Sequence, residues 1–153
     1  LQFVILGSGE WEFETFFHGA AAAHPDKVAL KLGFNPQLAH KIYAGADMFL
    51  MPSQSEPCGL AQMVALRYGT VPIVRETGGL NDTVSDSGDG EGNGFTFKNY
   101  NAHEMENAVW RALAGYGDKN GWNILRRRDM ECDNSWGVSA NAYIRLYKEI
   151  LAK

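Results

Sequence analysis

The stretch Met51-Pro52-Ser53-Gln54-Ser55-Glu56-Pro57-Cys58-Gly59-Leu60-Ala61-Gln62 decides how this chain folds. Residues 47–51 before it are mostly apolar, without alternation, and the run stops at Pro52, which predicts a buried strand. After the turn at Pro57 and Gly59, apolar side chains recur at helical spacing until Gly69, where a left-handed helix cap is expected. Open α/β sheets bind ligands in loops of this kind, between a strand and the following helix, so this loop is the first candidate for a functional site.

The rest of the chain repeats this alternation of strands and helices. Further strands are predicted at residues 3–6, 28–32, 71–74 and 95–97, and helices at residues 10–23, 36–46, 60–68, 102–114, 120–132 and about 135–151. Asn35, Asn101 and Ser135 precede three of these helices and are expected to cap them. The order indicates an α/β fold with a doubly wound, Rossmann-like parallel sheet that carries helices on both faces.

Two local features interrupt the regular pattern. Pro72 is awkward inside a central strand, so it is expected among the first residues of its strand or at a bulge. Residues 85–94 contain four glycines and no apolar side chain, which predicts a mobile loop.

Length and composition limit the organisation and the partners. The chain has 153 residues, 45% of them hydrophobic, which is enough for one core and too few for two ordinary domains, so one domain over residues 1–153 is expected. A formal net charge of -4 provides no basic surface for a phosphate backbone, and nucleic acid is not expected as a partner. No apolar run approaches the about 20 residues of a membrane span, so no membrane partner is expected either. Because the chain opens on a core strand without a start methionine, it is expected to be a fragment of a longer protein.

Several motifs that would indicate other chemistry are incomplete or absent. Gly7-Ser8-Gly9 follows a strand, but the third glycine of a dinucleotide fingerprint would fall at Glu12, so NAD binding is not expected. Cys58 and Cys132 form neither a metal-binding spacing nor a disulfide framework, which suits a reducing compartment. No histidine partner motif accompanies Cys58, so we expect a packed cysteine that presents its backbone rather than a nucleophile. No metal and no cofactor are expected.

Three segments carry a resemblance to a known family. Residues 55–62 read Ser-Glu-Pro-Cys-Gly-Leu-Ala-Gln, residues 65–72 read Ala-Leu-Arg-Tyr-Gly-Thr-Val-Pro, and residues 77–84 read Thr-Gly-Gly-Leu-Asn-Asp-Thr-Val. Together they resemble the C-terminal domain of bacterial glycogen synthases and plant starch synthases, which are retaining glycosyltransferases of family 5. The resemblance covers essentially the whole chain. It implies the C-terminal, nucleotide-sugar-binding half of a two-domain GT-B enzyme that transfers glucose from ADP-glucose to the non-reducing end of an α-1,4-glucan with retention.

The resemblance also implies roles for residues of the first candidate loop. Glu56 is the implied catalytic residue, which orients the donor glucose, although from its position alone it could equally be a solvated acid that caps the next helix. The main-chain amides of Cys58, Gly59 and Leu60 are implied to meet the sugar and diphosphate of the donor. Ser53 is counted among the nucleotide-sugar-binding residues of the same loop.

Further candidates lie outside this loop. Phe34 follows a strand end and is implied to stack on the adenine, although a ring at such a place can also pack in the core. Thr77, Gly78 and Gly79 are weaker candidates for a sugar contact, because a glycine pair can also simply turn the chain.

Two positions depart from related enzymes. Val64 stands where the wider superfamily carries a second glutamate, a change that the glycogen and starch synthase branch shares and that removes one presumed ribose contact. Ala61 replaces the threonine that is usual in the bacterial enzymes, so a hydroxyl contact is lost there.

The expected partners are ADP-glucose or UDP-glucose, an α-1,4-glucan that could be glycogen or starch, and the N-terminal domain of the same enzyme. The expected location is the bacterial cytoplasm or, for a plant enzyme, the plastid stroma. The isolated domain is expected to be inactive, because the upstream half of the active site is missing. The alternatives are a stand-alone nucleotide-binding module, a GT-B glycosyltransferase that uses a different nucleotide sugar, and a scaffold domain without a ligand.

Overall fold

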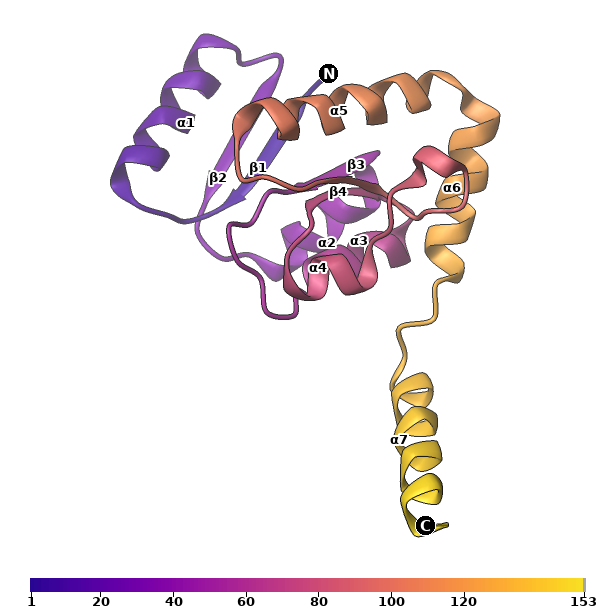
Figure 1. Cartoon of the computed structure of the whole chain (residues 1–153). Coiled ribbons are helices and arrows are strands. Elements are labelled where there is room, and N and C mark those ends of the chain that lie inside the picture. Colours follow the sequence, from indigo (N-terminus) through magenta and orange to yellow (C-terminus); the bar gives the residue numbers. More distant parts are fainter. Residues whose placement is uncertain (153) are drawn as a thin grey trace. The chain divides into compact units, whose positions relative to one another are not determined.

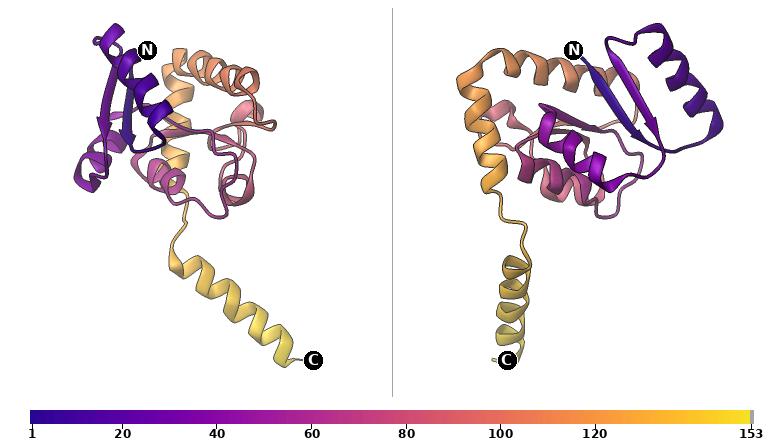
Figure 2. Two further views of the ribbon diagram at one scale, coloured as in Figure 1. Left: turned by 90° about the vertical axis from the view of Figure 1, so that its left-hand side faces the viewer. Right: turned by 180° about the vertical axis from the view of Figure 1, so that it is seen from behind.

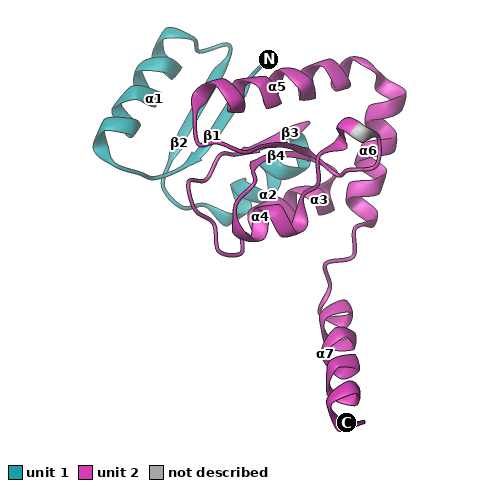
Figure 3. Cartoon of the chain, in the orientation of Figure 1, with its two compact units in different colours: residues 1–45 teal, residues 46–153 magenta. Residues whose placement is uncertain are grey.

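The computed structural model of the chain describes residues 1–152, apart from the side chain of Asp89. The chain divides into two compact units, Leu1–Gly45 and Ala46–Lys153 (Figure 3). Both units alternate strands with helices and every strand pair is parallel, which confirms the predicted α/β class. The strands form one two-stranded and one three-stranded sheet. The organisation of residues 1–153 as a single domain stays a prediction.

The first unit contains two strands and two helices, labelled in Figure 1: β1 (Phe3–Gly7), α1 (Trp11–Ala23), β2 (Val28–Leu32) and α2 (Pro36–Gly45). β1 and β2 pair in parallel, with α1 as the crossover between them. Asn35 caps α2 as predicted, because its side-chain oxygen accepts a hydrogen bond of 2.9 Å from the Leu38 N–H. Gly33 ends β2 with a φ of 101°, in the left-handed region that glycine adopts without strain. Phe34 therefore lies directly after the carboxyl end of β2.

The second unit is larger. Its elements are β3 (Met48–Met51), α3 (Ala61–Tyr68), β4 (Val71–Arg75), α4 (Gly78–Thr83), a short 3-10 helix (Ser87–Asp89), β5 (Phe95–Phe97), α5 (Ala102–Gly117), α6 (Lys119–Glu131) and α7 (Trp136–Leu151). The strand order is β3-β4-β5, so β4 is central, and its first four residues are buried. Pro72 is the second residue of β4 and precedes Ile73, where the pairing with β5 begins. It therefore sits among the first residues of its strand, as predicted.

Helices cover both faces of the three-stranded sheet, as expected for this fold. α5 lies on one face and α4 on the other (Figures 1 and 2). Alternate residues of β4 pack on opposite faces of the sheet, because successive side chains of a strand point in opposite directions. Val71 and Ile73 belong to a core cluster with residues of α5 and α6, whereas Val74 packs with Leu80 and Val84.

Local signals in the sequence predicted the caps at two helix ends of this unit. Gly69 ends α3 with φ 70° and ψ 28°, and Asn101 caps α5 by accepting a hydrogen bond of 2.9 Å from the Glu104 N–H. Ser135 occupies the predicted cap position of α7, but its side chain makes no capping hydrogen bond, so that detail was wrong. The helix α4 was not predicted, because residues 78–83 contain two glycines and no helical apolar pattern.

The segment Ser85–Gly94, expected to be a mobile loop, contains the short 3-10 helix and is held by side chains on both sides. Arg111 of α5 donates two hydrogen bonds, of 2.9 and 2.7 Å, to the carboxylate of Asp86. Arg128 of α6 donates to the carbonyl oxygens of Gly90 and Gly92. The segment is therefore anchored to α5 and α6. Its composition gave no indication of this anchoring.

The last helix, α7, differs from the others of its unit. None of its sixteen residues is buried, and its aromatic and aliphatic side chains, which include Trp136 and Leu151, are exposed. Within residues 1–152, no helix is long and apolar enough to cross a membrane.

Candidate functional site

The predicted site lies in the loop between β3 and α3, residues 52–60, which we call the β3–α3 loop. The loop leaves β3 at the carboxyl edge of the three-stranded sheet, where α/β proteins bind ligands. Arg75, at the end of β4, holds the loop from the adjacent strand by donating a hydrogen bond of 2.6 Å to the carbonyl of Gln54. It also donates to the carbonyl of Lys98 after β5. Arg75 thus joins the chain segments that follow all three strands.

Glu56 projects from this loop without a partner. Its side chain is partly buried, and its carboxylate makes no hydrogen bond or ion pair within residues 1–152. The plainer explanation, that this acid caps the next helix, is wrong, because the cap position of α3 is Leu60 and no side chain caps it. The main chain at Glu56 is fixed, since its carbonyl accepts a hydrogen bond of 3.1 Å from the Gly79 N–H. A carboxylate that is positioned but unpaired is available to a ligand.

The turn Cys58-Gly59-Leu60 presents backbone rather than side chains. Gly59 is buried and has a φ of 70°, a backbone conformation that residues other than glycine rarely adopt. The N–H groups of Gly59 and Leu60 have no acceptor in the described part of the chain. Cys58 is exposed, so the expectation of a packed cysteine was wrong, and its thiol makes a long contact of 3.8 Å with the Gly59 carbonyl.

The weaker candidates Thr77, Gly78 and Gly79 lie directly against this turn. A Cβ atom on Gly78 would come within 2.1 Å of the Glu56 carbonyl oxygen, and one on Gly79 within 1.9 Å of the Cys58 carbonyl oxygen. The glycine pair is therefore required for α4 to approach the β3–α3 loop, and it is more than a turn between elements. Thr77 occupies the cap position of α4, and its side chain makes no capping bond.

Gln62 was missed as a site residue although it belongs to the stretch that defines the loop. It is 0% exposed, and its side-chain nitrogen donates to the carbonyls of Gly59 and Cys58 at 2.8 and 3.2 Å. A signal was present: Gln62 stands at helical spacing with the buried residues Ala65 and Leu66, where an apolar side chain is the norm. Arg75 was missed too, and its signal was a basic residue at the carboxyl end of the central strand.

The two remaining predicted residues are Ser53 and Phe34. Ser53 is partly exposed at the start of the β3–α3 loop. Phe34 belongs to the first unit and is 95% exposed, so the alternative that it is a core aromatic is wrong. Its ring face is free for stacking.

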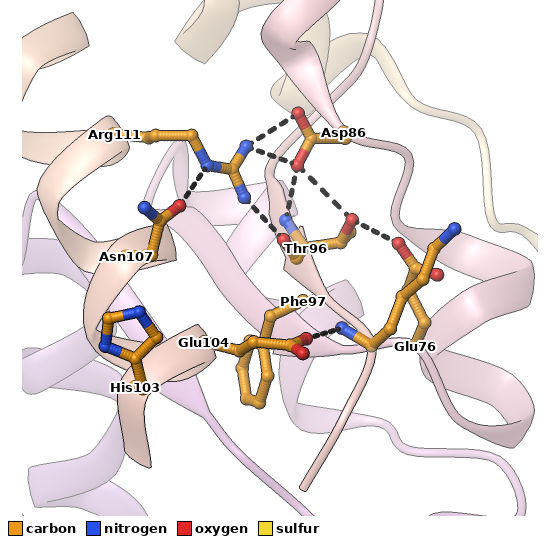
Figure 4. Close-up of a pocket in the computed structure, with 9 residues that line it drawn as sticks. Glu76, Asp86, Thr96, Phe97, His103, Glu104, Asn107 and Arg111 are labelled. Atoms are coloured by element: carbon orange, nitrogen blue, oxygen red, sulfur yellow. Dashed lines mark hydrogen bonds and ion pairs between the residues drawn. The ribbon is translucent and has the colours of Figure 1, made fainter. Parts of the chain in front are cut away.

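A hollow of about 430 Å³ lies beside β5 and α5, away from the β3–α3 loop (Figure 4). One pair of its charged groups is an ion pair: Arg111 points at Asp86 and at the carbonyl of Thr96, whereas Glu104 accepts a hydrogen bond from the backbone N–H of Lys98. Partial burial raises the pKa of Asp86, but the hydrogen bonds from Arg111 and from backbone N–H groups outweigh it, so the pKa lies below its ordinary value. These contacts of Arg111, Asp86 and Glu104 are made within the protein and stabilise the fold.

A second, more apolar hollow of about 340 Å³ is lined by Pro52 of the β3–α3 loop and by Tyr100, which also contacts Arg75 through a cation–π interaction of 5.8 Å. Within residues 1–152, no group of three or more histidine, cysteine or acidic residues could hold a metal ion.

Comparison with known proteins assigns the chain to a family. The family described as "Glycosyl transferases group 1" matches residues 1–124. The chain belongs to this family. It is 56% identical over 154 residues to the glycogen synthase of Anoxybacillus flavithermus and 55% identical over 155 residues to that of Geobacillus stearothermophilus. These matches cover 99% and 100% of this chain but 32% of each relative, so the chain spans about a third of their length.

Solved structures with a similar fold include a plant enzyme and a cyanobacterial one. The chain is similar to the catalytic domain of starch synthase IV from Arabidopsis thaliana, solved with ADP and acarbose, with a TM-score of 0.86 and 40% identity over 99% of this chain and 33% of that one. Sucrose-phosphate synthase from Thermosynechococcus elongatus shares the fold, with a TM-score of 0.68 at 22% identity over 99% of this chain and 39% of that one. The resemblance to glycogen and starch synthases, and the glycosyltransferase fold that it implied, are confirmed.

Proposed function

We propose that this group 1 glycosyl transferase chain is the nucleotide-sugar-binding part of a glycogen synthase. The whole enzyme transfers glucose from ADP-glucose to the non-reducing end of an α-1,4-glucan with retention of configuration. The N-terminal domain of the same enzyme supplies the other wall of the active site. The two glycogen synthases named above, at 56% and 55% identity, are bacterial, which supports glycogen as the product and the bacterial cytoplasm as the location.

One observation carries the proposal: the β3–α3 loop holds a carboxylate and two backbone N–H groups that are fixed in place but unpaired. Glu56 orients the glucose of the donor, and the N–H groups of Gly59 and Leu60 meet oxygens of the sugar or diphosphate. N–H groups that precede a helix favour negative charge, so they also stabilise the charge that develops on the leaving diphosphate. Ser53, at the start of the loop, is a further nucleotide-sugar-binding residue. The Gly79 N–H holds the loop by donating a hydrogen bond to the Glu56 carbonyl.

The base of the nucleotide contacts a residue outside the β3–α3 loop. Phe34 offers an exposed ring after β2, which suits stacking on adenine. Phe34→Ala in the full-length enzyme is expected to weaken ADP binding by about 1–3 kcal/mol, whereas Phe34→Tyr keeps the ring and changes binding little. Calorimetric titration with ADP measures both, and an unchanged dissociation constant for the alanine variant would remove Phe34 from the site.

The proposal is tested with the full-length enzyme that contains this chain. Purified enzyme is incubated with glycogen and with radiolabelled ADP-glucose or UDP-glucose, and glucose incorporated into the polymer is counted. We expect transfer from ADP-glucose at a kcat/KM well above that from UDP-glucose. Preference for UDP-glucose would correct the donor, and no transfer from either would reject the function.

A further inference from the structure

Gln62 is a fully buried amide directly beside the turn that the proposed function uses. Its relative exposure is 0%, although glutamine is among the residues that proteins mostly expose. Burying an amide costs free energy unless its hydrogen bonds are made, so its contacts indicate what it contributes.

Those contacts converge on the backbone of the turn. The Nε2 atom of Gln62 lies within hydrogen-bond distance of three acceptors, the Gly59 carbonyl at 2.8 Å, the Cys58 carbonyl at 3.2 Å and Thr83 Oγ1 at 3.1 Å, so one of its two hydrogens is shared. Thr83 in turn donates a hydrogen bond of 2.6 Å to the carbonyl of Gly79. The Gln62 side chain, which belongs to α3, thus contacts the turn directly and the glycine pair through Thr83.

The orientation of two peptide groups follows from these bonds. In a trans peptide the C=O and the N–H point in opposite directions, and residues 1–152 contain no cis peptide. The Cys58 carbonyl shares its peptide with the Gly59 N–H, and the Gly59 carbonyl shares its peptide with the Leu60 N–H. Because Gln62 holds both carbonyls on the buried side, both N–H groups face away from it. Successive free N–H groups of this kind form an anion-binding concavity.

The side-chain oxygen of Gln62 makes an unfavourable contribution to stability. Its Oε1 atom is buried and has no hydrogen-bond partner in the described residues, and a buried acceptor without a donor is unfavourable. This oxygen lies under Gly59, where a Cβ atom would come within 2.5 Å of it. An apolar side chain would avoid the cost, so the amide is retained for what its nitrogen does.

We propose that Gln62 is a positioning residue that aims the Gly59 and Leu60 N–H groups at the donor. It acts through the backbone and does not touch ADP-glucose itself. The inference rests on the proposed function, because it takes the nucleotide sugar as the ligand of the turn.

Two variants separate this role from a merely structural one. Gln62→Glu keeps the shape but replaces the donor nitrogen with a carboxylate oxygen that repels both carbonyls. Gln62→Met keeps the length without polarity or charge and is easily buried, so it keeps the test decisive if the buried charge unfolds the glutamate variant. Thr70→Val is the matched control: Thr70 is 1% exposed and donates to the Ala46 carbonyl at 3.2 Å, at the opposite edge of the sheet from the loop.

In the full-length enzyme, KM for ADP-glucose is expected to rise about 10- to 100-fold in both Gln62 variants, while KM for glycogen stays unchanged. Thr70→Val is expected to lower the melting temperature about as much as Gln62→Met and to leave both KM values unchanged. A folded Gln62→Met enzyme with the parental KM for ADP-glucose would overturn the proposal. If the parent enzyme does not use ADP-glucose at all, the proposed function fails first, and this inference fails with it.

Discussion

The β3–α3 loop and the segment Ser85–Gly94 are both irregular and rich in polar side chains, although only the segment is rich in glycine, and they use their polar groups in opposite ways. In the segment, Asp86 binds Arg111, and Asn93 accepts a hydrogen bond of 2.7 Å from the Ser85 N–H and donates one of 2.9 Å to the Thr83 carbonyl. In the loop, the Glu56 carboxylate is unpaired. A polar group that is already paired within the protein has little to offer a ligand, so pairing distinguishes the two regions better than composition does.

The largest effect is expected from Glu56→Ala in the full-length enzyme. Removing a group that acts at the reacting sugar should lower kcat by about 10²–10³-fold. The unfolding free energy should change by less than about 0.5 kcal/mol, because the carboxylate has no partner to lose. Glu91→Ala, which removes an acid of the other segment, is the control and should leave kcat unchanged. Steady-state kinetics and urea unfolding decide, and activity within a few-fold of the parent would make Glu56 a solvated acid.

The next largest effect is expected from a matched pair of glycine substitutions, one beside the β3–α3 loop and one in the segment Ser85–Gly94. A Cβ atom on Gly79 would clash with the Cys58 carbonyl at 1.9 Å, and one on Gly92 with the Asp86 carbonyl at 2.1 Å. Both Gly79→Ala and Gly92→Ala should cost about 1–3 kcal/mol of stability. Only Gly79→Ala should also raise KM for ADP-glucose, because it displaces the β3–α3 loop. Equal kinetics in the two variants would contradict a ligand role for the loop.

Arg111→Leu should have the reverse effect of Glu56→Ala, lowering stability by about 1–2 kcal/mol while kcat stays unchanged. The pH dependence checks the cause. Because the pKa of Asp86 is lowered in the folded protein, the stabilisation is complete above its ordinary pKa of 3.8 and is lost as the pH falls through the lower folded value. The parent should therefore lose more stability than Arg111→Leu between pH 7 and pH 3 in urea titrations. Parallel pH profiles would assign the pair no role.

The smallest effect is expected at Asp129 of α6, beside the arginine that holds Gly90 and Gly92. Asp129 is 1% exposed, neither carboxylate oxygen has a partner in the described residues, and burial raises its pKa to about 7 despite the nearby Arg128 and Arg126. Its folded pKa lies above the unfolded value of 3.8, so ionisation destabilises the fold and stability falls as the pH rises from about 4 to 7. Asp129→Ala should remove this fall and be about 1 kcal/mol more stable at pH 8. A variant less stable than the parent at pH 8 would show that the carboxylate has a favourable partner.

Much of the fold could be predicted because its signals are local. The strand before Pro52, the left-handed Gly69 and the caps Asn35 and Asn101 depend on residues a few positions apart. The predicted burial of that strand was wrong, because all four residues of β3 are only partly buried. The resemblance then supplied Glu56, whose sequence neighbourhood alone left its role open.

What could not be predicted depends on contacts between distant segments. The need for glycine at position 79 arises from the Cys58 carbonyl, and the use of Gln62 arises from the direction of two peptide groups. The burial of Asp129 and the anchoring of Ser85–Gly94 by Arg111 and Arg128 likewise follow only once α5 and α6 are packed. Local patterns carry no information about such approaches, which is why a flexible-looking segment proved to be anchored.

The helix α7 has a consequence for local unfolding. A helix of sixteen residues that buries none of them gains almost nothing from packing, and isolated helices of that length are marginal in water. Its amide hydrogens should therefore exchange with solvent within seconds, while those of α5 exchange only when the whole unit opens. A protease should likewise cut between Cys132 and Leu151 without releasing any residue of the core around Val71 and Ile73. In unit 2, amide exchange should thus separate α7 from the elements that carry the β3–α3 loop.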